Sequence, residues 1–397
     1  MIKQSLYCIF LVVLFSSCIS HNKNVKGKPV NVTTGLHYHD TVITIKIEPE
    51  MGLLDLTDKI TNVKYIPLET TRESVIGEIS KVILHKGNFY IMDDNITKTV
   101  FVFDGNGKFI TKICRRGRGP GEYNDLWDFD IDTENDQILL YCGPRKMIRT
   151  TLAGELVSEH RASFYGHSIA SMPNKGYAAY LYFSNNTSFQ INEHSLIYLD
   201  SLGNIVKGMF PYDHSKFGKY SNVWQASIFY TYQNKKYLYP STKDTVYRLS
   251  PDGLTPVYRF DFGKYSIDKT IFSKPVEEQD RFFKGNTKYA RLFFMTETDH
   301  VLHFHVAVNG IIHRVYYSKS TGEVISGPMV HYLGVSDLGV PIASSGNTLI
   351  DLLDCEMMIH AKDGIDNLQT TNSAYLEVVK NFKEDDNPVL MTYETSM

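Results

Sequence analysis

Short runs of hydrophobic residues separated by polar turns dominate the chain, and the clearest run is "GNFYIMDDNITKTVFVFDGNGKFITKI", residues 87–113. Phe89 and Ile91 stand two positions apart before the polar segment DDNITK, and the apolar residues 100–103 follow it. A spacing of two places side chains on one face of a β-strand. The segment DGNG is a hairpin signal, because glycine reaches positive φ without steric cost. The stretch therefore predicts three short strands joined by tight turns.

Weaker copies of this pattern recur along the chain, in residues 138–157, 195–206, 236–260 and 302–325. Each copy has a glycine in a turn, and with the first copy these glycines are Gly107, Gly154, Gly203, Gly253 and Gly322. Apart from the last interval, they stand about 47–50 residues apart, with room for about four strands per unit. Such a period is the signature of a β-propeller blade.

Two segments have a helical rather than an alternating pattern. Residues 273–285 lie in the long last interval, where Pro275 suits a first helical position and Gly285 suits the helix end. Residues 372–384 near the C-terminus have one apolar face, with Ser373 as the expected N-cap. That face is formed by Tyr375, Val378, Val379 and Phe382. Both segments are predicted to be short helical insertions in an all-β fold.

The glycines account for five blades, so a sixth blade must come from residues 340–397. We expect the N-terminal strands "TVITIKI", residues 41–47, and "VKYIPLE", residues 63–69, to close it, with "NPVLMTYE" as the last strand. Joining both chain ends in one blade removes the free sheet edges of an open array. The prediction is an all-β, six-bladed β-propeller over residues 38–397, with a pair of β-sandwiches as the alternative.

The N-terminus has the features of a targeting segment. Lys3 precedes an apolar run, residues 6–15, that is too short to span a bilayer. The small residues before Cys18 resemble a bacterial lipobox, in which the cysteine is acylated and becomes the first mature residue. We therefore expect a lipoprotein signal at residues 1–18 and a flexible tether at 19–37. In the alternative, the signal is an ordinary secretory one and Cys18 is incidental.

Composition narrows the classes of function. The chain is 43% hydrophobic and 21% charged, which is typical of a globular protein with a core. A net charge of −3 argues against nucleic acid as a partner. Beyond the signal, Cys114, Cys142 and Cys355 form neither a disulfide framework nor a CxxC zinc motif. Cys114 and Cys142 could pair if their strands are neighbours, or each could fill a core position.

The region around residues 63–135 resembles the six-bladed β-propeller lipoproteins of gut-type Gram-negative bacteria. It is also similar to the NHL repeat, in which a GxGPGxF/Y loop leads through an apolar strand to a "vFd-x-x-Gkf" hairpin; here these features are "GRGPGEY" and "VFDGNGKF". The resemblance fades in the middle blades. It implies a fold and a cell-envelope location rather than a reaction.

The loop "CRRGRGPGEY", residues 114–123, is the most distinctive candidate site. It lacks the Lys-Ser/Thr pair of a P-loop, and Pro120 and a following strand exclude a dinucleotide fingerprint. Its first interpretation is a connector between blades, with glycines in tight turns and an aromatic side chain packed inward. Its second adds a surface that binds a carboxylate or a sulfated sugar. The candidate residues are Arg115, Arg116, Arg118, Glu122 and Tyr123.

Other chemical motifs are weaker. The segment "DFDIDTEND", residues 128–136, lacks the glycine and glutamate of a calcium loop and is predicted to be a strand that ends in a polar turn. His303 and His305 share one side of a strand near His313, but no partner at metal-ligand spacing accompanies them, so we expect them to stack on aromatic rings at a blade surface. No nucleophile elbow or HExxH motif is present. No metal or cofactor is predicted.

The sequence therefore favours a lipid-anchored protein of the cell envelope that binds a ligand or a protein and is not an enzyme. The expected partners are the membrane, through the N-terminal lipid, and an envelope protein or a glycan. We expect attachment to the outer membrane, facing the periplasm. One alternative is a propeller hydrolase or lyase acting on a carbohydrate-like or lactone substrate with a metal in the central channel. Another is a structural partner of an outer-membrane uptake complex.

Overall fold

The structure is a computed structural model that describes residues 41–48, 52–143, 145–181, 184, 186, 194–211, 228–240, 243–284, 288–336 and 339–397. The predicted lipoprotein signal with Cys18 and the predicted tether lie outside these residues. Among the described helices, none is both long enough and apolar enough to cross a membrane.

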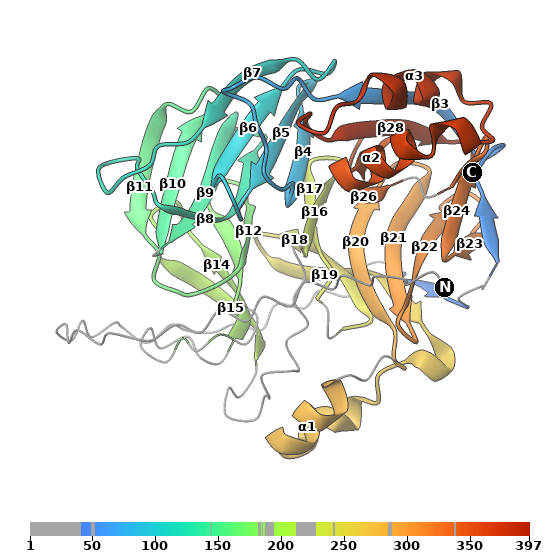
Figure 1. Cartoon of the computed structure of the whole chain (residues 1–397). Coiled ribbons are helices and arrows are strands. Elements are labelled where there is room, and N and C mark those ends of the chain that lie inside the picture. The colour runs from blue at the N-terminus through green and yellow to red at the C-terminus, as the bar shows by residue number, and fades with distance from the viewer. Residues whose placement is uncertain are drawn as a thin grey trace.

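Six β-sheets stand in a ring around a central channel (Figure 1). The innermost strand of each sheet contacts the innermost strands of both neighbouring sheets, so the ring is closed. This arrangement confirms the predicted six-bladed β-propeller and excludes the pair of sandwiches. The five turn glycines, used above to set the period, all have positive φ, between 76° and 144°.

The first three blades follow one another in the sequence, each running from its inner to its outer strand. Blade 1 consists of β4 (Lys81–His85), β5 (Asn88–Asp93), β6 (Thr99–Phe103) and β7 (Phe109–Ile113). Blade 2 consists of β8 (Asp125–Asp132), β9 (Gln137–Gly143), β10 (Lys146–Thr151) and β11 (Leu156–Arg161). Blade 3 consists of β12 (Ser168–Ser171), β13 (Tyr177–Tyr180), β14 (His194–Leu199) and β15 (Ile205–Pro211).

Among the other three blades, blades 4 and 6 include a strand from the N-terminal region and blade 5 does not. Blade 4 consists of β16 (Phe229–Tyr232), β17 (Lys235–Leu238), β18 (Thr245–Ser250), β19 (Gly253–Asp261) and β1 (Ile43–Lys46). Blade 5 consists of β20 (Arg291–Glu297), β21 (Val301–Val308), β22 (Ile311–Ser318) and β23 (Val324–Gly327). Blade 6 consists of β26 (Val340–Ser345), β27 (Thr348–Leu353), β28 (Val389–Thr395) and β3 (Ile60–Pro67).

The ring is closed by one of the two predicted N-terminal strands. Residues 63–69 overlap β3, which pairs with the C-terminal β28 in blade 6 as expected. The expectation for residues 41–47 is wrong, because β1 pairs in parallel with β19 on the outside of blade 4. Ile45 lies opposite Phe260 there and is 1% exposed in the core between blades 4 and 5. A small extra sheet is formed by β2 (Leu53–Asp55), β24 (Met329–Tyr332) and β25 (Val335–Ser336).

The hydrophobic core is divided into six clusters, one at each interface between adjacent blades. Alternation along a strand produces this division, because successive side chains point to opposite faces of a sheet. In β5, for example, Phe89 packs toward blade 6 and Tyr90 packs toward blade 2. Cys142 is fully buried in the cluster between blades 1 and 2. Cys114 and Cys142 are both free, so the pairing left open above is absent.

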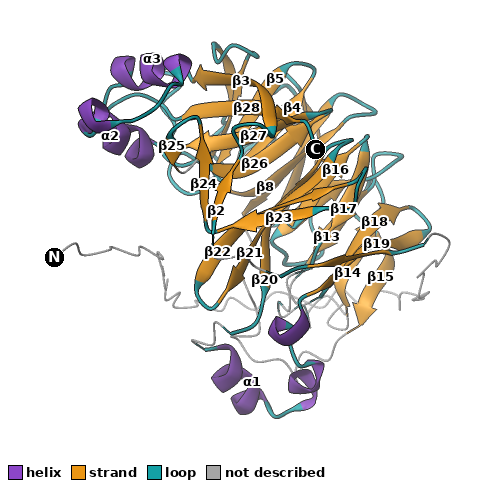
Figure 2. Cartoon of the chain, turned by 90° about the vertical axis from the view of Figure 1, so that its right-hand side faces the viewer, coloured by secondary structure: helices purple, strands orange, loops and turns teal. Residues whose placement is uncertain are grey.

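The helical insertion predicted at 273–285 is present between blades 4 and 5, and its α-helix projects from the ring (Figures 1 and 2). It contains η4 (Gly263–Tyr265), η5 (Lys269–Ser273) and α1 (Val276–Phe283). Pro275 is the N-cap rather than the first helical residue, and Gly285 lies outside the described residues.

Two α-helices and a short 3₁₀-helix lie in blade 6 between β27 and β28: α2 (Cys355–Asp363), η6 (Ile365–Asn367) and α3 (Ser373–Asn381). The prediction of α3 is confirmed, but its N-cap is Asn372 and not Ser373. The Asn372 side chain accepts a hydrogen bond of 3.1 Å from the backbone N of Tyr375. The α2 helix was not predicted, because only Met358 and Ala361 of its side chains are buried and no apolar face marks it.

Candidate functional site

The arginine-rich loop of residues 114–123 joins β7 of blade 1 to β8 of blade 2, so it is a connector between blades. Tyr123 is 2% exposed and its hydroxyl donates a 2.8 Å hydrogen bond to the carbonyl of Ile113. The Glu122 carboxylate accepts a 2.8 Å bond from the backbone N of Gly119. These two candidate residues therefore stabilise the loop itself.

The three arginines of the loop differ in their surroundings. Arg116 donates a 2.9 Å hydrogen bond to the carbonyl of Thr97. Arg115 and Arg118 are exposed, and within the described parts of the chain their guanidinium groups have no hydrogen-bond or ion-pair partner. Binding of a partner by this loop stays a prediction that concerns mainly these two side chains.

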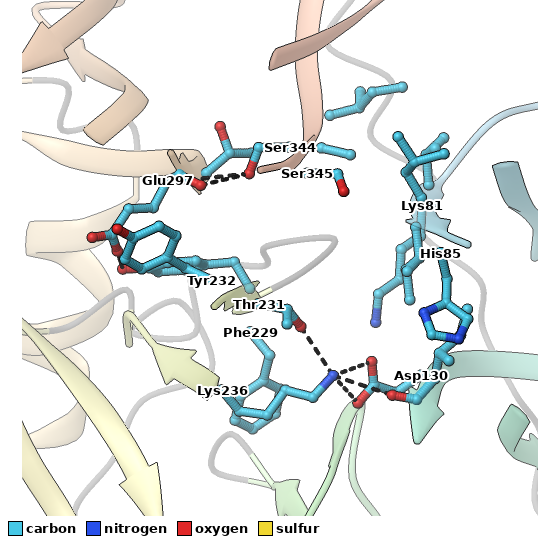
Figure 3. Close-up of a pocket in the computed structure, with 18 of the residues that line it drawn as sticks. Lys81, His85, Asp130, Phe229, Thr231, Tyr232, Lys236, Glu297, Ser344 and Ser345 are labelled. Carbon is cyan, nitrogen blue, oxygen red and sulfur yellow. Dashed lines mark hydrogen bonds and ion pairs between the residues drawn. The ribbon is translucent and has the colours of Figure 1, made fainter. Parts of the chain in front are cut away.

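A cavity of about 340 Å³ lies at one end of the central channel, away from the arginine-rich loop. Figure 3 shows residues that line it. Five of the six innermost strands line it: β4, β8, β16, β20 and β26. The turns that follow these strands form its rim, with Lys86, Thr133, Asn234, Asp299 and Gly346. The arginine-rich loop leads into the start of β8, whereas the cavity opens where the inner strands end. This cavity is the candidate functional site.

One wall of the cavity is held by buried ion pairs between different blades. Lys236 of blade 4 reaches Asp130 of blade 2 at 2.7 Å (Figure 3). Lys81 of blade 1 reaches Asp128 of blade 2 at 2.8 Å. Lys236 also donates to the hydroxyl of Thr231 at 2.9 Å. All four charged side chains are at most 10% exposed. The pairs fix three blades relative to one another around the channel.

Burial and the neighbouring lysines shift the pKa values of Asp128 and Asp130 in opposite directions. Burial raises the pKa of Asp128 above its usual value even though Lys81 lies beside it. Burial would also raise the pKa of Asp130, but Lys236 and Lys81 together hold that pKa below its usual value. The Asp130 carboxylate therefore stays ionised at neutral pH as the partner of Lys236.

The opposite wall is built around Glu297, at the end of β20. Its carboxylate accepts hydrogen bonds from the hydroxyls of Tyr230 at 2.8 Å and Tyr258 at 2.7 Å. Lys319 pairs with the same carboxylate at 2.6 Å. Burial, with the nearby Glu297 charge, raises the pKa of Tyr230 well above its usual value, so this hydroxyl stays protonated as a donor. The negative charge of Glu297 is thus compensated by Lys319 and by the two tyrosine hydroxyls.

The segment compared above with a calcium loop is the end of strand β8 followed by a turn at residues 133–136, as predicted. Its three alternate carboxylates, those of Asp128, Asp130 and Asp132, are buried, and each forms an ion pair with a basic side chain. The third pair joins Asp132 to Arg149 at 3.1 Å. Alternating aspartates in an otherwise apolar strand are the sequence signal that could have marked one wall of the channel. The two lysines carry no such signal, because each lies in a different blade.

The histidine pair is buried between blades 5 and 6, so its expected place at a blade surface is wrong. His303 does stack on Tyr316, as expected, with ring centroids 4.1 Å apart and planes 6° apart. His305 meets the ring of Phe294 edge-on at 5.9 Å. Across the described residues, no three His, Cys, Asp or Glu side chains form a group that could hold a metal ion.

Comparison with known proteins gives one family match. The family described as "Domain of unknown function (DUF4934)" matches residues 41–394, which is nearly the whole propeller. No curated protein sequence matches the chain significantly.

Solved structures provide a further comparison. A crystal structure from Bacteroides fragilis, described as that of a "Putative exported protein", has a TM-score of 0.73 at 17% identity, covering 90% of this chain and 100% of that one. A Bacteroides vulgatus member of the DUF4221 family has a TM-score of 0.47 at 11% identity, covering 85% and 97%. The Cps50 (Swd1) propeller of Myceliophthora thermophila has a TM-score of 0.39 at 10% identity, covering 83% and 99%. At these identities the first match supports the shared fold, and the other two are too distant to add to it.

Proposed function

The chain belongs to the DUF4934 family, and we propose that it is an exported, lipid-anchored β-propeller that binds a small ligand in the cavity at the end of its channel. The observation that carries this proposal is the convergence of five inner strands on one cavity of about 340 Å³. Ligand sites of proteins are concave, of roughly 300–1,000 Å³, and lined by aromatic side chains with a few polar groups. This cavity has both kinds of lining.

The charges of the cavity support binding as its role. Lys81, Lys236 and Glu297 each have an oppositely charged partner at 2.6–2.8 Å. Side chains held in such pairs form a rigid wall, and a pre-formed wall lowers the entropy cost of binding. The proposal rests on this pre-formed cavity.

The proposal is tested by blocking the cavity. Ser345 lines its rim, so Ser345→Trp should fill the opening. Arg118→Trp adds the same side chain to the exposed arginine-rich loop and is the matched control. Purified full-length variants are screened against a small-molecule library by saturation-transfer NMR. We expect ligands of the wild type to be lost in Ser345→Trp and kept in Arg118→Trp. Loss of binding in Arg118→Trp with binding kept in Ser345→Trp would show that the ligands bind the loop, and would refute the proposal.

Export and lipid attachment are supported by the sequence pattern of residues 1–18 and by the name of the similar Bacteroides fragilis protein. In this proposal Cys18 carries the lipid, and the protein faces the periplasm from the outer membrane. The test expresses wild type and Cys18→Ala in a Gram-negative host and separates detergent-phase from aqueous proteins. We expect the wild type in the detergent phase and the variant in the aqueous phase. Equal partitioning of the two proteins would refute lipid attachment.

The exposed side chains of Arg115 and Arg118 make the arginine-rich loop a second candidate surface, for an acidic group of an envelope protein or glycan. The Arg118→Trp control above also tests this surface. A pull-down from envelope extract with Arg115→Ala/Arg118→Ala, compared with wild type, isolates the two side chains. A partner that the wild type captures and the variant loses would support docking there.

A further inference from the structure

Phe294 has an unusual backbone conformation for a bulky residue. Its φ is 47°, and it lies in a β-bulge of β20, where the register with β21 shifts between Phe293 and Thr296. Positive φ is unfavourable for a bulky side chain, because its Cβ approaches the backbone carbonyl. Bulges of this kind turn a side chain in a new direction and are frequent beside functional sites. The unfavourable backbone conformation of Phe294 therefore indicates that its side chain has a specific role.

Phe294 belongs to the lining of the cavity and is partly exposed. Phe294 lines the cavity and is 39% exposed, whereas the other phenylalanine of the lining, Phe229, is 7% exposed. The tyrosines of the lining are less exposed than Phe294. Two of them donate hydrogen bonds to carboxylates, Tyr230 to Glu297 and Tyr232 to Asp299. Phe294 thus offers the most exposed aromatic surface in the cavity, and core packing does not account for that position.

The same segment has two further unfavourable features. The hydroxyl of Thr296, which also lines the cavity, is buried without a hydrogen-bond partner among the described residues. Nε2 of His305, whose ring meets Phe294, is likewise buried and without a partner in the described chain. An unsatisfied buried polar atom costs stability. The bulge is therefore not arranged for stability alone.

The charges around the ring indicate the chemistry of the ligand. Lys81, Lys236 and Glu297 are paired within the protein, so a charged ligand that bound them would have to break existing ion pairs. The exposed Asp299 on the rim accepts hydrogen bonds from the Tyr232 hydroxyl and the Gln233 amide. The remaining lining includes neutral hydroxyl and amide groups, such as those of Asn234 and Ser345. A flat apolar surface beside neutral hydrogen-bonding groups suits a ring that has an apolar face and hydroxyls at its edge.

We propose that Phe294 is the stacking platform for a neutral sugar ring in this cavity. This inference rests on the proposed function and names its ligand class: a mono- or disaccharide without charge, as the small volume of the cavity requires. The sugar places its C–H face on the Phe294 ring and its hydroxyls on the neutral groups of the rim. The bulge keeps the ring in the cavity instead of the core.

The test measures the binding of neutral sugars to full-length protein by saturation-transfer NMR and titration calorimetry. The probes are glucose, galactose, mannose, N-acetylglucosamine and their common disaccharides, with free amino acids and nucleotides as charged probes. The variants are Phe294→Ala and Phe294→Gly, because glycine accepts the positive φ and preserves the bulge. We expect a neutral sugar to bind the wild type, and both variants to bind it at least about tenfold more weakly.

Phe210 provides a matched control. It is a phenylalanine with a φ of 54°, but its ring packs against Tyr247 between blades 3 and 4, and it does not line the cavity. We expect Phe210→Ala to lower the melting temperature and leave sugar affinity within twofold of the wild type.

The outcomes separate this inference from the proposed function. If the Phe294 variants bind the sugar as tightly as the wild type, Phe294 is not the platform. If only charged probes bind, and Ser345→Trp abolishes that binding, the cavity is a ligand site but the sugar inference is overturned. If no probe of any class binds, both proposals are refuted.

Discussion

Replacing Lys236 by methionine removes one charge from the buried pair that spans the channel. The Lys236 amine lies 2.7 Å from the Asp130 carboxylate, and the two side chains are 10% and 6% exposed. Methionine preserves most of the aliphatic length of lysine, so the change mainly deletes the charge. Asp130 would remain buried, with the backbone N of Ser171 at 2.6 Å and the more distant charge of Lys81 as its other stabilising contacts.

The magnitude follows from the burial of the pair. At 2.7 Å and an effective dielectric constant of about 20, the Coulomb attraction is about 6 kcal/mol, which offsets the cost of removing both charges from water. Deleting one partner of a buried pair typically costs about 3–5 kcal/mol, because the other charge is left uncompensated. We therefore expect Lys236→Met to lower the free energy of unfolding by about 3–5 kcal/mol at pH 7. The double variant Lys236→Met/Asp130→Asn should recover most of this loss.

The pH dependence of the stability difference provides an independent test of this reasoning. In the wild type the pKa of Asp130 is depressed, so its stabilising contribution is present above the unfolded pKa and is lost as pH falls through the folded pKa. Without Lys236, burial dominates and raises this pKa, so protonation relieves the penalty in acid. The difference between the variant and the wild type should therefore shrink between pH 7 and pH 4.

The assay is urea unfolding followed by fluorescence at both pH values, with Lys235→Met, an exposed neighbour in β17, as the control. A loss below about 1 kcal/mol for Lys236→Met at pH 7 would refute the reasoning. So would a double variant no more stable than Lys236→Met alone.

Two further predictions concern residues outside the cavity. Tyr123→Phe removes the hydroxyl bond to the buried carbonyl of Ile113 and should lower the free energy of unfolding by about 1–2 kcal/mol, measured by the same urea titration; an unchanged midpoint would contradict it. Burial and the nearby Arg314 lower the pKa of His303 well below its usual value, so the unfolded chain takes up the proton first and stability falls as pH drops below about 6.5. His303→Phe keeps the stacking on Tyr316 and should lose less stability between pH 7.5 and 5.5 than the wild type, by up to about 1.4 kcal/mol per pH unit. Parallel pH profiles of the two proteins would show that His303 does not contribute.

The fold could be predicted largely from the sequence because blade structure depends on local signals. Alternating residues such as Phe89 and Ile91 and turn glycines such as Gly107 lie within a few positions of the elements they specify. The partner of β1 could not be predicted in this way. In its pairing with β19, Ile45 lies opposite Phe260. No residue pattern in residues 41–47 indicates whether this strand pairs with the edge of blade 4 or with that of blade 6.

The candidate site could not be assembled from the sequence, because its parts come from five blades. Lys236 and Asp130 meet only because the ring brings blades 2 and 4 together across the channel. The arginine-rich loop attracted attention as a contiguous motif, yet Tyr123 and Glu122 are used to hold the loop itself. The positive φ of Phe294 has no sequence signal, since bulky residues rarely adopt it.

Hydrogen–deuterium exchange with and without a bound ligand from the screen tests the central claim most directly. The account predicts slower exchange in residues 229–234 and 342–346, which line the cavity, and unchanged exchange in residues 114–123. Protection confined to residues 114–123, with the cavity segments unaffected, would contradict it.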